Sequence, residues 1–176
     1  MHKNMKKLLI VVDYQVDFVS GSLGFDYALK LEDGIYNLIN EYLENGHDVV
    51  FTLDTHSESY LDTEEGKYLP VKHCIKNTVG HEIFGKVKEL VGNNKVFEKA
   101  TFPSSELLTY LLDKDYDYIE LCGVVTNICV LSNAVIAKAA KPLAHITVNQ
   151  KLCASNDLEM EQKSLDVMKN LQIEII

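Results

Sequence analysis

Cys129 is the residue of this chain best placed to act as a covalent nucleophile. It follows an apolar run at residues 118–121 and a glycine, and it lies near the start of residues 128–140, whose apolar side chains recur at helical spacing. A thiol in the first turn of a helix lies near the positive end of the helix dipole, and free N–H groups of that turn can hold an oxyanion. We therefore predict a strand, a sharp turn and a nucleophile at a helix start, with Thr126 or Asn127 as the N-cap. The alternative is a buried structural cysteine.

Two charged residues follow other apolar runs. Asp13 comes directly after residues 8–12, and Lys99 follows the short run at residues 96–97. Asp13 can act as a general base towards a thiol or a water, although an aspartate at this place can also cap a turn. Lys99 can hold Asp13 ionised and lower the pKa of the Cys129 thiol, and its alternative is an ordinary surface lysine.

A third group has the donor atoms of a metal site. Asp54 and His56 stand two residues apart at the end of another apolar run, and His73 follows after a stretch that offers the carboxylates of Glu58, Asp62, Glu64 and Glu65. Two imidazoles with one or two carboxylates form a mixed nitrogen and oxygen set, which suits zinc, or iron or manganese in octahedral geometry. The alternative is a solvated acidic loop.

These residues need a scaffold, and the apolar runs predict one. Strands are expected at residues 8–12, 48–53, 96–97, 118–121, 144–148 and 173–176, and helices at residues 31–45, 81–91, 104–112, 128–140 and 157–170. Strands that alternate with helices predict an α/β fold with an open, mostly parallel sheet flanked by helices. The length of 176 residues suits one domain over residues 1–176.

The predicted scaffold places the candidate residues on one edge of the sheet. Asp13, Asp54, Lys99 and the turn at residues 123–129 each follow the carboxyl end of a predicted strand. Open α/β sheets bind ligands in the crevice outside those ends, so four distant segments are expected to meet at one site. The stretch from residue 55 to about residue 80 is predicted to be irregular and functional, because long loops are uncommon inside compact domains.

Composition disfavours several function classes. The formal net charge is −9 without a basic patch, which argues against a nucleic-acid partner. No apolar run reaches the roughly 18 residues of a membrane span, and the short run after the N-terminus lacks a signal-peptide cleavage site. The four cysteines form no CxxC pair, so we expect a cytoplasmic protein with reduced thiols, in which Cys74, Cys122 and Cys153 are structural.

Taken together, the motifs resemble those of the isochorismatase-like cysteine hydrolases, and within that family the nicotinamidases. The likeness is carried by IVVDYQVDF at residues 10–18, TLDTH at 52–56, LPVKHCI at 69–75, FEKATF at 97–102 and GVVTNICV at 123–130. It runs in order from about residue 8 to about residue 150. The resemblance implies a three-layer, Rossmann-like fold.

The resemblance also implies a catalytic triad of Asp13, Lys99 and Cys129. Asp13 would take the thiol proton, and Cys129 would attack an amide carbonyl to form a thioester that water then hydrolyses. A cis peptide bond between Val124 and Val125 would aim the N–H groups of Val125 and Cys129 at the oxyanion.

By the same resemblance, a divalent metal beside the triad would bind the pyridine nitrogen of the substrate. Zinc is expected, with Fe²⁺ or Mn²⁺ as alternatives. Asp54, His56 and His73 match three of the family's ligands. Glu65 is the expected fourth ligand, and Glu64 is its alternative.

The substrate pocket departs from the family pattern. Phe18 matches one pocket aromatic, and a one-residue offset leaves Tyr68 or Leu69 at the position of the other. The complete metal set favours a nicotinamidase, which converts nicotinamide to nicotinate and ammonia and would act in NAD salvage. The alternatives are a hydrolase of another small amide or of isochorismate, and a non-catalytic member that binds a metabolite. The family further implies a homo-oligomer, either a dimer or a tetramer.

Overall fold

The sheet is built from six strands that run in the same direction. A computed structural model describes residues 5–176, and its strands are β1 (Lys7–Val12), β2 (Asp48–Asp54), β3 (Lys95–Lys99), β4 (Tyr118–Val124), β5 (His145–Ala154) and β6 (Glu174–Ile175). Their order across the sheet is β3-β2-β1-β4-β5-β6, and neighbouring strands are parallel throughout. The predicted open, parallel α/β sheet is confirmed.

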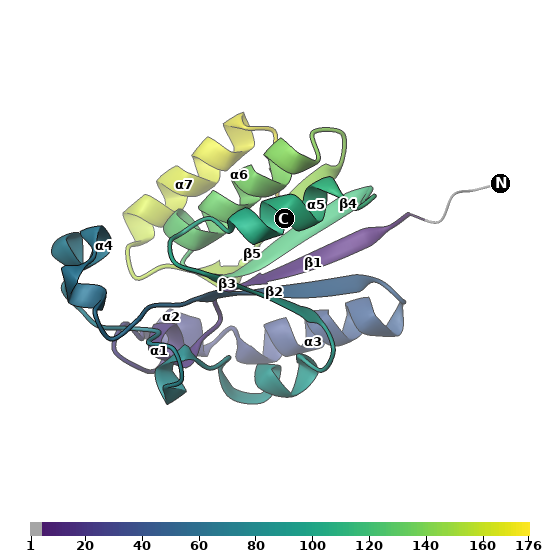
Figure 1. Cartoon of the computed structure of the whole chain (residues 1–176). Helices are drawn as coiled ribbons and strands as arrows, with labels where there is room; N and C mark the ends of the chain where they lie inside the picture. Colours follow the sequence, from purple (N-terminus) through teal and green to yellow (C-terminus); the bar gives the residue numbers. More distant parts are fainter. Residues whose placement is uncertain (1–4) are drawn as a thin grey trace.

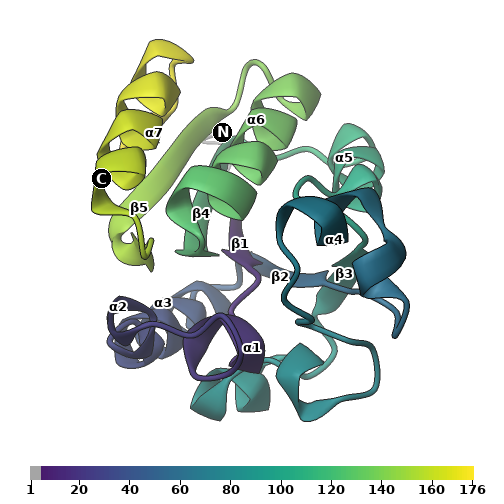
Figure 2. The same ribbon diagram turned by 90° about the vertical axis from the view of Figure 1, so that its left-hand side faces the viewer.

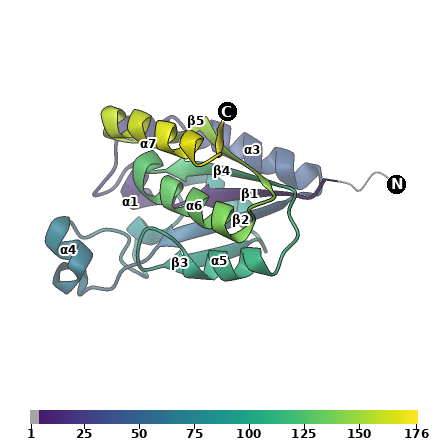
Figure 3. The same ribbon diagram turned by 90° about the horizontal axis from the view of Figure 1, so that it is seen from above.

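Helices cover both faces of the sheet and give the molecule three layers (Figure 1). One face carries α1 (Val16–Val19), α2 (Asp26–Leu29) and α3 (Glu32–Glu44). The other face carries α5 (Ser105–Leu112), α6 (Leu131–Ala140) and α7 (Leu158–Asn170), which are nearest the viewer in Figure 3. Among residues 5–176 no helix has the length and apolar character that a bilayer crossing requires.

The central strand β1 divides the hydrophobic core in two. Its side chains alternate between the faces, because successive residues of a strand point to opposite sides. Leu8, Ile10 and Val12 pack in the core beneath α5, α6 and α7, whereas Leu9 and Val11 pack in the core beneath α3. A strand buried on both faces needs a continuous apolar run, which is why this run was visible in the sequence.

Two of the predicted helices begin at side-chain caps. Ser104 Oγ accepts a hydrogen bond of 3.1 Å from the backbone N–H of Leu107 at the start of α5. Asp157 Oδ1 accepts one of 2.9 Å from the N–H of Met160 at the start of α7. The helices predicted at residues 104–112 and 157–170 are therefore confirmed.

Other elements differ from prediction. The stretch after residue 55, predicted to be irregular, contains the short helical segments η1 (Tyr60–Asp62), α4 (Glu64–Tyr68) and η2 (Val79–His81). The helix predicted at residues 81–91 is instead a 3₁₀ segment, η3 (Gly85–Leu90), which follows η2. The strands predicted at residues 118–121 and 144–148 both continue further, to Val124 and Ala154, because they pair again at these residues beyond a register shift.

Candidate active site

The residues predicted at strand ends lie together on the carboxyl edge of the sheet, which faces the viewer in Figure 2. Asp13 follows β1, Asp54 and Lys99 are register partners at the ends of β2 and β3, and Cys129 lies in the turn after β4. All four side chains are buried. Gly123 permits this convergence, because its φ is 117° and a Cβ there would lie 2.1 Å from the carbonyl oxygen of Val12.

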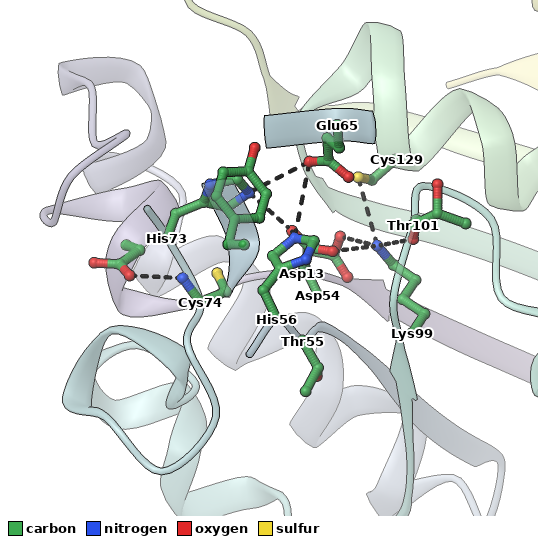
Figure 4. A network of polar contacts seen from close by, with 12 residues as sticks. Asp13, Asp54, Thr55, His56, Glu65, His73, Cys74, Lys99, Thr101 and Cys129 are labelled. Carbon is green, nitrogen blue, oxygen red and sulfur yellow. Dashed lines mark hydrogen bonds and ion pairs between the residues drawn. The ribbon is translucent and has the colours of Figure 1, made fainter. Parts of the chain in front are cut away.

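Lys99 lies between the candidate base and the candidate nucleophile (Figure 4). Its Nζ is 2.6 Å from Oδ2 of Asp13 and 3.6 Å from Sγ of Cys129, and it also donates to the carbonyl oxygen of Thr101 at 3.1 Å. Thr52 Oγ1 donates to the other oxygen of Asp13 at 2.7 Å. The structure therefore brings the predicted acid, amine and thiol into one buried cluster.

Burial governs the protonation of this cluster. It raises the pKa of the Cys129 thiol well above its usual value, and the charge of Asp13 adds to the rise, whereas Lys99 opposes it. Lys99 thus acts on the thiol pKa in the predicted direction, but burial outweighs it. Burial also raises the pKa of Asp13 in spite of Lys99. A neutral thiol needs a base, and a carboxylate of raised pKa is a stronger base than an exposed one.

The turn that carries the thiol has an unusual backbone. Residues Thr126–Val130 form a π-helical turn, in which the N–H of Val130 donates to the carbonyl of Val125 at 3.2 Å, five residues back. The Val124–Val125 peptide bond is cis, as the resemblance implies. The predicted N-cap is wrong, because neither candidate side chain caps the turn. Thr126 Oγ1 instead donates to Glu161 of α7 at 2.6 Å, and Asn127 accepts from Ser155 Oγ at 2.6 Å.

Asn133 braces the same turn and was not predicted. Its side chain is fully buried in α6, one helical turn after Cys129. Its Nδ2 donates to the carbonyl oxygens of Cys129 at 2.8 Å and Phe102 at 3.0 Å, and its Oδ1 accepts from the N–H of Ser104 at 3.0 Å. The side-chain amide of Asn133 thus joins the turn that carries Cys129 to residues 102–104, which follow Lys99 in the chain. A buried asparagine within a mostly apolar helix is the signal that could have identified it.

The candidate metal ligands also converge. One donor atom from each of Asp54, His56, Glu65 and His73 lies within 4.8 Å of the other three. The Nε2 atoms of His56 and His73 are 2.9 and 3.2 Å from Oδ2 of Asp54, and 3.8 and 3.6 Å from Oε1 of Glu65. This set of two imidazoles and two carboxylates fits a divalent cation such as zinc.

The environment of His73 supports that fit. Its Nδ1 donates to the carbonyl oxygen of Val71 at 2.8 Å, which turns Nε2 towards the other ligand atoms. Burial lowers the pKa of His73, but hydrogen bonds to Asp54 and Glu65 raise it more, to about 10 overall. For Asp54, burial by itself raises the pKa. Hydrogen bonds from the two histidines and the charge of Lys99 lower it by more, so the pKa of Asp54 is lowered overall. The carboxylates of Asp54 and Glu65 therefore favour a positive charge at this site.

Glu65, and not its neighbour, faces the histidines. Glu64 lies on the exposed side of α4, where it pairs with Lys67 at 3.1 Å. Since successive residues of a helix point in different directions, only one of the two carboxylates can reach the cluster from this helix. The structure thus distinguishes the two residues that the sequence left open.

A cavity of about 200 Å³ joins the thiol to the ligand cluster. Cys129, Asp54, Glu65 and His73 contribute to its lining, and the remaining lining side chains are mostly apolar: Phe18, Leu23, Phe25, Leu69, Phe102, Val125 and Ile128, together with Asn156. The ring of Phe18 packs 5.5 Å from that of His73. The cavity is small, which restricts it to compact ligands.

The structure corrects one predicted pocket residue. Tyr68 is 84% exposed and does not line the cavity, whereas Leu69 and Phe18 do. The side chain of Tyr68 leaves α4 on its solvent side, so Leu69 takes the position that the sequence left open between them. Leu23, Phe25 and Phe102 were missed, because they lie in irregular segments whose direction a sequence pattern does not give.

Comparison with known proteins gives a consistent result. Residues 7–176 match the sequence profile described as the isochorismatase domain. The chain is 34% identical to the Bacillus subtilis (strain 168) protein named "Uncharacterized isochorismatase family protein PncA", over 76% of this chain and 79% of that one.

Two solved structures show the same fold at similar identity. The nicotinamidase/pyrazinamidase PncA from Bacillus subtilis superposes with a TM-score of 0.87 at 30% identity, covering 97% of this chain and 99% of that one. The pyrazinamidase of Pyrococcus horikoshii, solved in complex with zinc, gives a TM-score of 0.86 at 27% identity, covering 97% and 98%.

Proposed function

The chain belongs to the isochorismatase family, and we propose that it is an amidohydrolase that converts nicotinamide to nicotinate and ammonia. Hydrolysis of an amide C–N bond is the activity for which its similar relatives of solved structure are named. The observation that carries the choice of substrate is the cavity, in which a thiol with its base lies at one side and a nitrogen and oxygen ligand set at the other. That arrangement suits a small amide whose ring bears a donor atom.

The buried cluster supplies the chemistry of a two-step hydrolysis. Asp13 takes the proton of the Cys129 thiol, and the sulfur attacks the amide carbonyl carbon. The N–H groups of Val125 and Cys129 hold the oxygen of the tetrahedral intermediate, at the bend after Val124. The proton passes to the leaving nitrogen, ammonia departs, and a thioester remains on Cys129.

The second step uses the same residues in reverse. Asp13 takes a proton from a water molecule, which attacks the thioester carbonyl, and the acid is released as the thiol regains a proton. Lys99 stays protonated through both steps, because Asp13 and Cys129 outweigh the effect of burial on its pKa. Its charge stabilises the Asp13 carboxylate and the developing thiolate.

Asp54, His56, Glu65 and His73 would hold the divalent metal, with zinc preferred by the donor set and Fe²⁺ or Mn²⁺ as alternatives. When bound, the ion would offer a Lewis-acid contact to the ring nitrogen of a pyridine amide. Phe18 and Leu69 contribute apolar wall to the same cavity. These side chains exclude water from one part of the ring and fix its orientation towards Cys129.

The cavity disfavours isochorismate, which carries two carboxylates. Lysine and arginine are absent from its lining among the described residues, and Asp54 and Glu65 face into it. The charges of these two carboxylates would already neutralise a divalent metal held between them, so the two charges of a dianion would stay uncompensated in the cavity, which is costly. A neutral amide avoids this cost.

An ammonia-release assay tests the proposal. We expect turnover of nicotinamide and of pyrazinamide, much weaker turnover of benzamide, which lacks a ring nitrogen, and loss of the nicotinamide reaction with a chelator. Cys129→Ala should bind nicotinamide but not hydrolyse it. Binding of nicotinamide by the wild-type chain without ammonia release would support a metabolite-binding protein instead. Turnover that a chelator leaves unchanged would remove the role assigned to the metal.

Two further expectations come from the family, and a third, the cytoplasmic location, comes from the cysteine pattern. A homo-oligomer, either a dimer or a tetramer, is checked by sedimentation equilibrium. Cytoplasmic location and a place in NAD salvage stay predictions, and nicotinate production in cells that express the chain would test the second.

A further inference from the structure

Residues 60–69 form a small cap beside the cavity, which we define as η1 together with α4 and Leu69. Figures 1 and 3 show α4 beyond the carboxyl ends of the strands. The cap is closed by its own hydrogen bonds. Thr63 Oγ1 donates to the carbonyl of Tyr60 at 2.6 Å and accepts from the N–H of Gly66 at 3.0 Å, and the N–H of Leu69 donates to the carbonyl of Glu65 at 2.8 Å.

Gly66 lets the two halves of the cap pack closely. A Cβ at this position would lie 2.2 Å from the carbonyl oxygen of Tyr60, so a larger residue would push α4 away from η1. The position of Glu65, which precedes the glycine in α4, therefore depends on the position of Tyr60.

The cap presents two residues to the site, and they have different partners. Glu65 reaches the ligand cluster through Oε1, while Leu69 lines the cavity. One candidate metal ligand and one residue of the apolar wall thus lie in the same ten-residue segment. The contacts that position Leu69 relative to the ligand cluster are different from the contacts that Glu65 makes within that cluster.

Tyr60 links the ligand cluster to the cavity wall at Leu69. Its side chain is fully buried, and its ring packs edge-on against the rings of His56 and His73, with centroids 4.7 and 4.9 Å away. Its hydroxyl donates to the carbonyl oxygen of Leu69 at 2.8 Å. The ring therefore contacts the ligand histidines, and the hydroxyl holds the residue that forms the cavity wall.

We propose that Tyr60 is a positioning residue that sets the substrate-facing wall at Leu69 relative to the ligand cluster, through its hydroxyl. The inference rests on the proposed function only for its substrate. The ring and the hydroxyl act separately, because the ring remains when the hydroxyl is removed. Loss of the hydroxyl frees the carbonyl of Leu69 and loosens the end of the cap, while the histidines keep their packing partner.

The test compares Tyr60→Phe with Tyr110→Phe. The hydroxyl of Tyr110 also makes a partly buried hydrogen bond, of 2.8 Å, to the hydroxyl of Tyr116, and Tyr110 does not line the cavity. Steady-state kinetics on nicotinamide, zinc affinity by competition with a chromogenic chelator, and trypsin cleavage after Lys67 are measured for each variant. Lys67 is suited to cleavage because its side chain is 65% exposed within the cap.

We expect Tyr60→Phe to raise KM about five- to tenfold, as loss of one hydrogen bond that orders a binding wall predicts, with kcat and zinc affinity within about twofold of wild type. Cleavage after Lys67 should become faster in the zinc-loaded protein. Tyr110→Phe should leave KM and cleavage unchanged. Leu69→Ala should raise KM as well, and the double variant should be less than additive, because both changes act on one wall.

A purely structural role for Tyr60 gives a different result. In that case Tyr60→Phe lowers thermal stability while KM and the cleavage rate stay at wild-type values, and the proposal is overturned. It is also overturned if the double variant is fully additive. If the wild-type chain does not hydrolyse nicotinamide, the proposed function fails, and the cleavage comparison alone still decides whether the hydroxyl orders the cap.

Discussion

The Nζ atom of Lys99 lies 3.7 Å from Oδ1 of Asp54, whose other oxygen faces the two histidines of the ligand cluster. Asp54 is therefore a neighbour of both the candidate triad and the candidate metal site. Register pairing of the two residues at the ends of β2 and β3 produces this contact. Any change of charge on one side of Asp54 is felt on the other over a few ångströms of buried space.

Removing the lysine should be costly for stability as well as for turnover. Lys99→Met leaves Asp13 and Asp54 buried without their cation, and breaking a buried pair of this kind costs about 3–5 kcal/mol. We expect urea unfolding to show a decrease in the free energy of unfolding of that size, together with loss of activity. Lys95→Met is the matched control, because Lys95 is an exposed residue of the same strand. Equal stability of the two variants would contradict the assigned ion pair.

The raised pKa of Cys129 predicts slow alkylation at neutral pH. Burial favours the neutral thiol, so the reactive thiolate is scarce below the pKa and becomes abundant as the pH rises through it. We expect iodoacetamide to label Cys129 of the metal-free protein more slowly than a free cysteine peptide at pH 7. The rate should climb about tenfold per pH unit below the pKa, since the thiolate fraction does so.

Mass spectrometry of the labelled peptides separates Cys129 from the three other buried cysteines. Lys99 opposes the rise in the thiol pKa, so Lys99→Met should shift the labelling profile to still higher pH. Labelling at pH 7 as fast as that of the peptide would show that burial does not raise the thiol pKa. Labelling much faster than that of the peptide would show that the thiol is already ionised and would argue against Asp13 as its base.

Two adjacent glutamates should respond differently to the same substitution. Glu65→Gln removes a carboxylate that faces both histidines, and we expect zinc affinity to fall at least about tenfold. Glu64→Gln, its matched control on the exposed side of α4, should bind zinc like wild type. Isothermal titration calorimetry of both variants decides the question, and a fall in affinity for Glu64→Gln alone would reverse the assignment.

Asn133 should matter for turnover although it does not line the cavity. Asn133→Ala leaves the carbonyls of Cys129 and Phe102 and the N–H of Ser104 without their partner, at a cost of about 1–3 kcal/mol in unfolding free energy. Because the turn then relaxes around Cys129, we expect kcat to fall more than the loss of folded protein explains. Ser132→Ala, in the same helix, is the control. If kcat per folded molecule is unchanged, the brace is structural only.

The sequence could predict the strands and the polar residues at their ends. Residues 8–12 form a continuous apolar run and residues 48–53 are mostly apolar, because parallel strands are buried on both faces. A charged residue that ends such a run is expected at the sheet edge. Asp13, Asp54 and Lys99 were identified in this way, and the edge brings them together. Local caps at Ser104 and Asp157 were equally visible, since a cap needs only neighbours in sequence.

Features that depend on partners distant in the chain could not be predicted from the sequence. Thr126 was predicted as a cap from its position alone, but Glu161 of α7 competes for its hydroxyl in the folded chain. The π-helical turn, the cavity wall at Phe102 and the buried hydroxyl of Tyr60 likewise arise from packing. The net shift of the Cys129 pKa could not be predicted either, because motifs indicate the charges near a residue but not its depth of burial.

The strand order has a consequence for how the chain acquires its chemistry. Asp13 follows β1 and Lys99 ends β3, with β2 between these strands, and Cys129 follows β4 on the other side of β1. A partly formed sheet that lacks any of these four strands has no complete site. During refolding, or during synthesis on the ribosome, catalysis therefore appears only after the long-range pairings are made, which are the slow contacts of such topologies.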